Sequence, residues 1–186
     1  MFLARVATAA FAIVASAALG AEPQQAPPAA PSGGAAVKVV TTEPIHALVL
    51  PMKGSYLQHQ QAFEQLVGQL QTLGAAPTGA PFGRYFNEMS VGEANLLWEI
   101  GFPIPAGVTA KPPFEVKDIP GTLTAILVHS GPYEESATEW PNLIQWIGSH
   151  GYRPSGTPMH VFLGDPIVPG TGGPRTELRM PVEKAQ

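Results

Sequence analysis

The strongest constraint on the fold is an internal repeat with an offset of 77 residues. When the chain is aligned with itself at this offset, residues 49–86 match residues 126–163 without a gap. Eight positions are identical to their partners 77 residues later, namely Leu50, Gly54, Tyr56, Leu66, Gly74, Pro77, Gly79 and Pro81. Chance alignment is the alternative, but the identical Gly, Tyr and Pro residues at equivalent positions of the two halves favour duplication. The sequence therefore predicts two similar modules.

Each half shows the same order of secondary-structure signals. An apolar run predicts a strand at 45–50 and again at 123–129, and each run ends at a Gly-containing turn. Apolar residues at helical spacing follow at 63–73 and 140–147, and Gly74 and Gly151 lie where helix C-caps are expected. Further strands are predicted at 82–86, 95–104, 114–117, 159–163 and 177–182.

This order predicts an α+β fold made of two strand–helix–strand–strand modules in a pseudo-two-fold duplicate. The sheets are expected to be antiparallel, with the helices on one face and a cleft between the modules. We place this cleft on the face opposite the helices, where the two halves meet.

Composition excludes several functional classes. The 186 residues carry a formal net charge of −4 and include no cysteine. Disulfides, thiolate metal sites and cysteine nucleophiles are therefore excluded, and general nucleic-acid binding is disfavoured. The five histidines show no metal-binding spacing, and neither a phosphate-binding loop nor a nucleophile elbow is present. We predict no metal and no cofactor.

The N-terminal segment, residues 1–20, has the features of a bacterial signal peptide. Arg5 precedes an apolar stretch, and Ala18 and Gly20 suit the −3 and −1 positions of a cleavage site. An uncleaved membrane anchor is the alternative, but the stretch is short and consists mostly of Ala and Val. We expect cleavage after Gly20, no integral membrane segment afterwards, and a periplasmic or secreted protein. Residues 21–36 are predicted to form a Pro/Ala-rich disordered linker before a single domain at 37–186.

Seven short motifs follow one another in a recognisable order between residues 101 and 178. They are Gly101-Phe102-Pro103-Ile104, Ile119-Pro120-Gly121, Gly131-Pro132-Tyr133, Trp146-Ile147, Gly151-Tyr152, the segment from Pro158 through Phe162 to Pro166, and Thr176-Glu177-Leu178. Over about 37–184, this order resembles the GyrI-like, or AraC-type multidrug-regulator, effector-binding domains. The resemblance implies two modules about a pseudo-two-fold axis. It also implies an aromatic-lined cleft that binds small molecules, often aromatic and cationic.

One position departs from the pattern that the resemblance implies. Family members usually carry a buried Glu that pairs with a cationic ligand, and this sequence has His160 there. If Met159 and Val161 pack under the helix, strand alternation directs His160 and Phe162 into the cleft. The repeat places Tyr85 beside them as the other half of an aromatic clamp, with ordinary core packing as the alternative.

A replacement carboxylate is available on the predicted strand 95–104. Alternation assigns Trp98 and Ile100 to the helix-covered core and directs Glu99 toward the cleft, although an exposed position at the rim is the alternative. The predicted ligand-binding residues are therefore Tyr85, Glu99, His160 and Phe162.

These features predict that the protein binds a small apolar or aromatic molecule between its two modules. One alternative is hydrolysis of a reactive small molecule with Glu99 or His160 as general base, because some stand-alone members of the resembled family are similar to such hydrolases. The other is a protein-interaction module with a closed pocket. The sequence indicates no particular protein partner.

Overall fold

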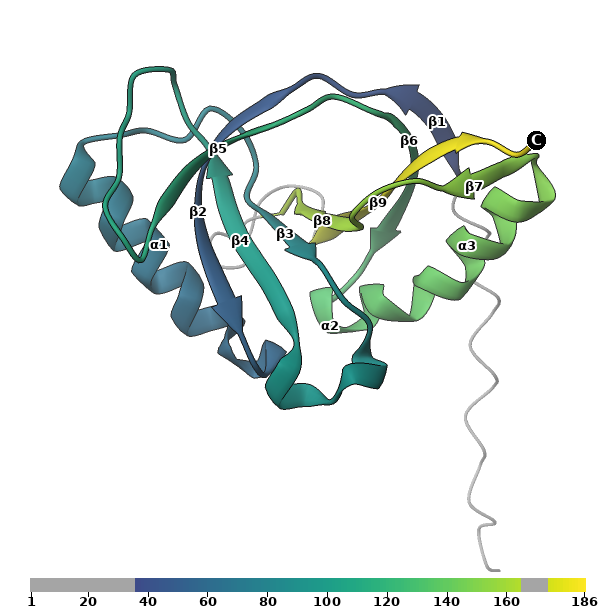
Figure 1. Ribbon diagram of the computed structural model, residues 1–186, viewed down its shortest axis with the longest axis horizontal. Helices are drawn as coiled ribbons and strands as arrows, with labels where there is room; N and C mark the ends of the chain where they lie inside the picture. Colours follow the sequence, from purple (N-terminus) through teal and green to yellow (C-terminus); the bar gives the residue numbers. More distant parts are fainter. Residues whose placement is uncertain (1–35, 165–173) are drawn as a thin grey trace, which may run out of the picture. The chain divides into compact units, whose positions relative to one another are not determined.

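A computed structural model describes residues 36–164 and 174–186 of the chain (Figure 1). The expected signal peptide (1–20) and nearly all of the expected linker lie outside these residues. The described strands are β1 (Lys38–Thr41), β2 (Ile45–Lys53), β3 (Phe82–Tyr85), β4 (Leu97–Pro103), β5 (Glu115–Ile119), β6 (Leu123–Ser130), β7 (Tyr152–Pro154), β8 (Met159–Phe162) and β9 (Arg175–Lys184). The described helices are α1 (His59–Leu73), α2 (Tyr133–Ser136) and α3 (Trp140–Ser149), with short 3-10 turns at Tyr56–Gln58, Met89–Val91, Glu93–Asn95 and Ala137–Glu139.

The described strands pair antiparallel in one sheet whose order reflects the duplication. The order is β1-β6-β9-β8-β3-β4-β2-β5, and β7 pairs with β9. The three strands β6-β9-β8 of one module thus mirror the three strands β2-β4-β3 of the other. The modules also exchange their first strands. β1 precedes β2 in the chain but pairs with β6, and β5 precedes β6 but pairs with β2.

The offset of 77 residues relates the two modules element by element. β1, β2, α1, β3 and β4 correspond to β5, β6, α3, β8 and β9. Gly74 and Gly151, the expected C-cap residues, both adopt left-handed conformations with φ of 62° and 76°. Gly83 and His160, which are 77 residues apart, lie directly opposite each other in the β3–β8 pair. The pseudo-two-fold axis therefore passes between β3 and β8, and the predicted α+β fold is confirmed.

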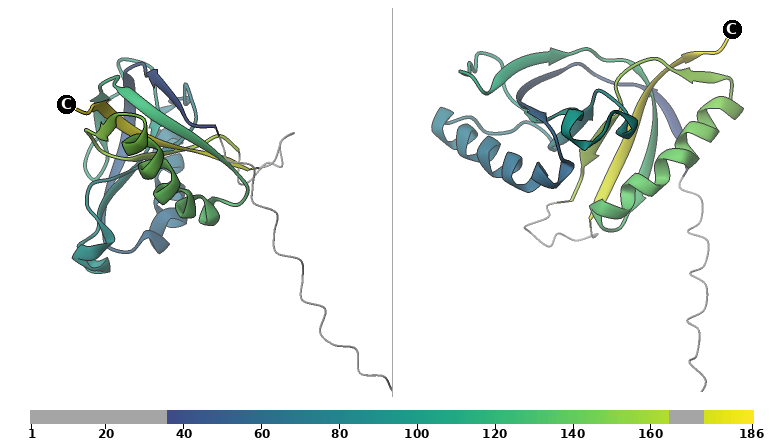
Figure 2. Two further views of the ribbon diagram at one scale, coloured as in Figure 1. Left: turned by 90° about the vertical axis from the view of Figure 1, so that its right-hand side faces the viewer. Right: turned by 60° about the horizontal axis from the view of Figure 1, so that its bottom comes forward.

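The two long helices cover the same face of the sheet, one over each module (Figures 1 and 2). Leu66 and Leu70 of α1 pack against Trp98 and Ile100 of β4 in a buried core. Leu143, Ile147, Leu178 and Met180 form the matching core under α3. Each such buried side chain contributes roughly 1.5–3 kcal/mol. None of the helices in the described part of the chain has the length and apolar character to span a bilayer.

The opposite face of the sheet carries its own apolar cluster. Ala47, Val49, Phe82, Ile119, Met159 and Val161 are buried there. The placement of Met159 and Val161 corrects the expectation that they pack under the helix. The sequence correctly separated Met159 and Val161 from His160 and Phe162. Both sets consist of apolar or aromatic residues, so the pattern does not show which set faces the helices.

Candidate functional site: an aromatic cluster between the modules

Aromatic side chains from both modules meet on the helix-bearing face of the sheet. This aromatic cluster consists of Tyr56, His59, Phe63, Tyr85, Tyr133, Trp140, His160 and Phe162. The first four belong to the first module and the last four to the second. Ring centroids are 5.2 Å apart for Tyr85 and His160 and 4.9 Å apart for Tyr133 and Phe162. Edge-to-face arrangements at such distances are favourable for aromatic rings.

The duplication accounts for most of the cluster. Three pairs of its members are related by the 77-residue offset: Tyr56 with Tyr133, Phe63 with Trp140, and Tyr85 with Phe162. The fourth pair, Gly83 and His160, breaks the symmetry. A methyl group on Gly83 would lie 2.9 Å from the Tyr85 hydroxyl, so the missing side chain makes room for the Tyr85 ring. In the second module the same position carries the His160 imidazole.

His160 is the buried member of the cluster, with 4% of its surface exposed. The indole Nε1–H of Trp140 donates to His160 Nε2 over 2.9 Å, and the two rings stack 5.3 Å apart at 12°. Because an indole N–H can only donate, Nε2 must hold a free lone pair, and the proton of the neutral imidazole lies on Nδ1. Burial, followed by the charge of His59, lowers the pKa of His160 to about 4.

The Nδ1 atom of His160 is buried and has no hydrogen-bond partner among the described residues. The preceding assignment makes it an N–H donor. Leaving such a donor unpaired typically destabilises a fold by about 1–3 kcal/mol. Unpaired buried groups are rare and require a reason.

A chain of hydrogen bonds crosses from one module to the other. His59 Nδ1 donates to the backbone carbonyl of Tyr56 over 2.6 Å, so its Nε2 accepts from the Tyr85 hydroxyl over 3.3 Å. Because the Tyr85 hydrogen is used in this way, Tyr133 donates to the Tyr85 oxygen over 3.1 Å. Burial lowers the pKa of His59 and raises the pKa values of Tyr85 and Tyr133. His59, Tyr85 and Tyr133 are therefore uncharged near neutral pH.

The structure brings three of the four predicted site residues together. Tyr85, His160 and Phe162 are members of the aromatic cluster. They lie on the helix-bearing face, which corrects the expectation of a cleft on the opposite face. His160 is directly opposite Gly83, and Gly83 opposite Ile100, whose side chain packs under α1.

Glu99 does not lie with the other three. It pairs directly with Arg84 across β3 and β4, on the face of the sheet away from the helices. The carboxylate is fully buried, and its two oxygens accept from Arg84 Nη1 and Lys117 Nζ, each over 2.9 Å. The expectation that Glu99 shares a cleft with His160 is therefore corrected. Both candidates for a general base are engaged, Glu99 with two cations and His160 Nε2 with the indole of Trp140.

Five members of the cluster were not identified from the sequence: Tyr56, His59, Phe63, Tyr133 and Trp140. The repeat contained a signal for most of them. Tyr56 and Tyr133 are identical equivalents, and Phe63 and Trp140 are equivalent aromatic positions. His59 had no such signal, because its equivalent in the second module is Ser136.

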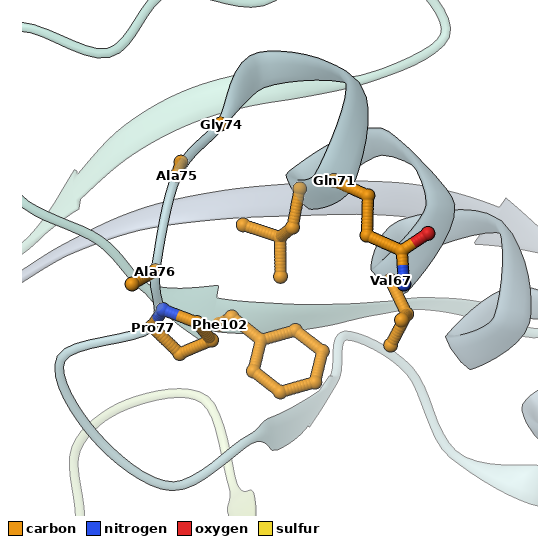
Figure 3. Close-up of a pocket in the computed structure, with 8 residues that line it drawn as sticks. Val67, Gln71, Gly74, Ala75, Ala76, Pro77 and Phe102 are labelled. Atoms are coloured by element: carbon orange, nitrogen blue, oxygen red, sulfur yellow. The ribbon is translucent and has the colours of Figure 1, made fainter.

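Two cavities of the described structure lie outside the cluster. One, of about 340 Å³, is lined mostly by apolar residues at the C-terminal end of α1, including Val67, Pro77 and Phe102 (Figure 3). The other, of about 250 Å³, lies on the opposite face of the sheet and includes Arg84 and Met159. Within residues 36–164 and 174–186, no group of three or more acidic or histidine side chains is placed to hold a metal ion.

Comparisons with known proteins agree with this architecture. The EcmrR C-terminal domain superposes with a TM-score of 0.72 at 16% identity, covering 81% of this chain and 99% of that domain. An uncharacterized conserved protein from Listeria innocua superposes with a TM-score of 0.65 at 16% identity, covering 82% of this chain and 94% of that one. A hydrolase from Listeria innocua superposes with a TM-score of 0.59 at 16% identity, covering 79% of this chain and 91% of that one. At these identities the likeness shows the fold alone.

Sequence comparison assigns the family. No curated protein is a significant match. The family model of the GyrI-like small molecule binding domain matches residues 35–183, which include both modules and every member of the aromatic cluster. The chain therefore belongs to the GyrI-like small molecule binding domain family.

Proposed function

We propose that the protein binds a small, apolar or aromatic molecule among the rings of the aromatic cluster. The observation that carries the proposal is the contrast within this cluster. Seven of its side chains are partly exposed, whereas His160 is buried and its Nδ1 has no partner among the described residues. Four of the seven rings, those of Tyr85, Tyr133, Trp140 and Phe162, lie against His160. Partly exposed rings provide apolar contact area, and the unpaired N–H provides a point of orientation, which together are typical of ligand sites. Membership of a small molecule binding family supports the same function.

Tyr85 and Tyr133 both lie against His160, and we infer that a ligand separates them to reach it. The hydrogen bond between Tyr85 and Tyr133 crosses the cluster, and a neutral hydrogen bond of this kind contributes only about 0.5–1.5 kcal/mol. Contacts between a ligand and several aromatic rings are sufficient to offset that loss. We therefore propose that the Tyr85–Tyr133 bond opens when the ligand binds.

The proposal is tested by removing one ring from the cluster and one from the nearby cavity. Benzophenone serves as a probe, and its binding to the full-length chain is measured by calorimetry and by the rise in Tm. Phe162→Ala removes a ring of the cluster and is expected to weaken binding at least tenfold. Phe102→Ala removes a ring that lines the 340 Å³ cavity, and it is expected to retain wild-type affinity.

The opposite pattern would place the ligand in the cavity at the end of α1 and contradict the proposal. Absence of binding by any aromatic probe would favour the alternative of a protein-interaction module with a closed pocket. Circular dichroism of both variants separates loss of binding from loss of folding.

We further propose that this binding takes place outside the cytoplasm. The support is the signal-peptide pattern of residues 1–20, with Arg5 before an apolar stretch and Ala18 and Gly20 before the expected cleavage site. The test is cell fractionation with N-terminal sequencing of the mature protein. A first residue of Ala21 is expected, and an uncleaved chain in the cytoplasmic fraction would contradict it.

A further inference from the structure

We infer that the ligand held at His160 is uncharged and carries a hydrogen-bond acceptor, such as a carbonyl oxygen, which receives the Nδ1 proton. This inference rests on the proposed function and names the chemical class of its ligand. It differs from the cationic ligands that a carboxylate at the same position would select.

Trp140 determines which nitrogen of His160 carries the proton and remains available to a ligand. Its indole N–H occupies Nε2, so the proton of the imidazole is confined to Nδ1. The stacking of the two rings, 12° from parallel, also fixes the orientation of the imidazole. A ligand therefore meets a single donor in a fixed position, and only an acceptor satisfies it.

The cluster offers no carboxylate to a cationic ligand, so cation–π attraction to its ring faces is the compensation that it provides. Among the described residues, the hydrogen-bond partners of the cluster side chains are one another and the backbone carbonyl of Tyr56. The buried carboxylate of Glu99 lies on the other face of the sheet and is already bonded to Arg84 and Lys117. Glu134 of α2, whose charge contributes to the raised pKa of Tyr133, is exposed to solvent. A cation would therefore lose its hydration next to the positive end of an N–H bond.

An anionic ligand is equally poorly matched. His160 and His59 are the groups of the cluster that could become positively charged, and burial lowers the pKa values of both. Near neutral pH the cluster therefore provides dipoles and no full positive charge. A buried anion held by one neutral donor would lose more hydration than it regains.

The test compares two probes that share a pair of phenyl rings and differ at the bridging group. Benzophenone and diphenylmethane have the same pair of rings, but only benzophenone has a carbonyl oxygen. Their affinities for the full-length protein are measured by calorimetry at pH 7, together with that of the cation tetraphenylphosphonium. Wild-type protein is expected to bind benzophenone about tenfold more tightly than diphenylmethane, and tetraphenylphosphonium more weakly than benzophenone.

Three variants assign this preference to the His160 donor. His160→Phe keeps an aromatic ring but removes the donor, so the affinity ratio of the two probes is expected to fall to about one. Trp140→Phe keeps the stacking partner but releases Nε2, so the ratio is expected to fall part of the way. His150→Gln is the matched control, because His150 is exposed and stacks on Trp146 outside the cluster. It is expected to keep the wild-type ratio.

The outcomes separate this inference from the proposed function. Equal binding of benzophenone and diphenylmethane to wild-type protein would overturn the inference and leave the proposed function standing. An unchanged ratio of benzophenone to diphenylmethane affinity in folded His160→Phe would also overturn the inference alone. Tighter binding of tetraphenylphosphonium than of benzophenone would have the same consequence. If none of the three probes binds, the proposed function itself fails.

Discussion

Acidification is expected to destabilise the fold through His160. In the unfolded chain this histidine has an ordinary pKa near 6.5, whereas burial lowers the folded pKa to about 4. Between these two values the unfolded state binds more protons, so the free energy of unfolding rises with pH. The stability contributed by the neutral imidazole is therefore complete above pH 6.5 and is lost as the pH falls toward 4.

The size of the effect follows from the two pKa values. A difference of about 2.5 pKa units corresponds to about 3 kcal/mol in total. The part lost between pH 8 and pH 5 is about 2 kcal/mol, because the folded histidine is still mostly neutral at pH 5. This is a large fraction of the stability of a typical domain.

Urea unfolding of the full-length protein at pH 8 and pH 5 measures this loss. His160→Gln cannot titrate, so its loss between the two pH values is expected to be about 2 kcal/mol smaller than that of wild type. The contribution of His59, whose pKa is also lowered, remains in both proteins. His150→Gln is the control and is expected to behave as wild type, because His150 is exposed. Equal losses in wild type and His160→Gln would refute the burial of a neutral imidazole.

Three further substitutions test other parts of the structure. Glu99→Gln is expected to lower the free energy of unfolding by about 1–3 kcal/mol while leaving benzophenone affinity unchanged, and a large loss of affinity would place Glu99 in the site after all. Tyr133→Phe removes the hydrogen bond to Tyr85 and is expected to lower the free energy of unfolding by about 0.5–1.5 kcal/mol. Because this bond no longer has to open, stopped-flow fluorescence should show faster benzophenone binding, and slower binding would contradict the proposed opening. Gly101→Ala places a methyl group 2.5 Å from the Phe82 ring, so urea unfolding should show a loss of about 1–3 kcal/mol, and a neutral effect would contradict this packing.

Local pattern was sufficient to predict the two long helices, most strands and the duplication, but not β1, β7 or the short helix α2. The apolar positions of α1 and α3 recur at helical spacing, and Gly74 and Gly151 end both helical patterns as left-handed residues. The pairing partners of the short strand β1 were beyond such reasoning. Its four residues pair with β6 more than 80 positions away, and no local signal encodes that exchange between modules.

The candidate site was predicted in part, and the errors have a common cause. Alternation correctly separated Glu99 from Trp98, because one set of β4 residues is clearly more apolar than the other. In β8 both sets are large, so the sequence did not reveal that His160, rather than Met159, faces the helices. His59 lies in a polar helical turn, and only the folded structure brings it to the Tyr85 hydroxyl.

The most direct test of ligand binding at His160 is nitrogen-15 NMR of the histidine rings in the full-length protein during titration with benzophenone. Before addition, His160 is expected to carry its proton on Nδ1 and none on Nε2 near neutral pH. Benzophenone is then expected to shift the Nδ1 resonance of His160, while the exposed His150 is unaffected. A proton on Nε2, or saturation with benzophenone that leaves the His160 resonances unchanged, would contradict these expectations.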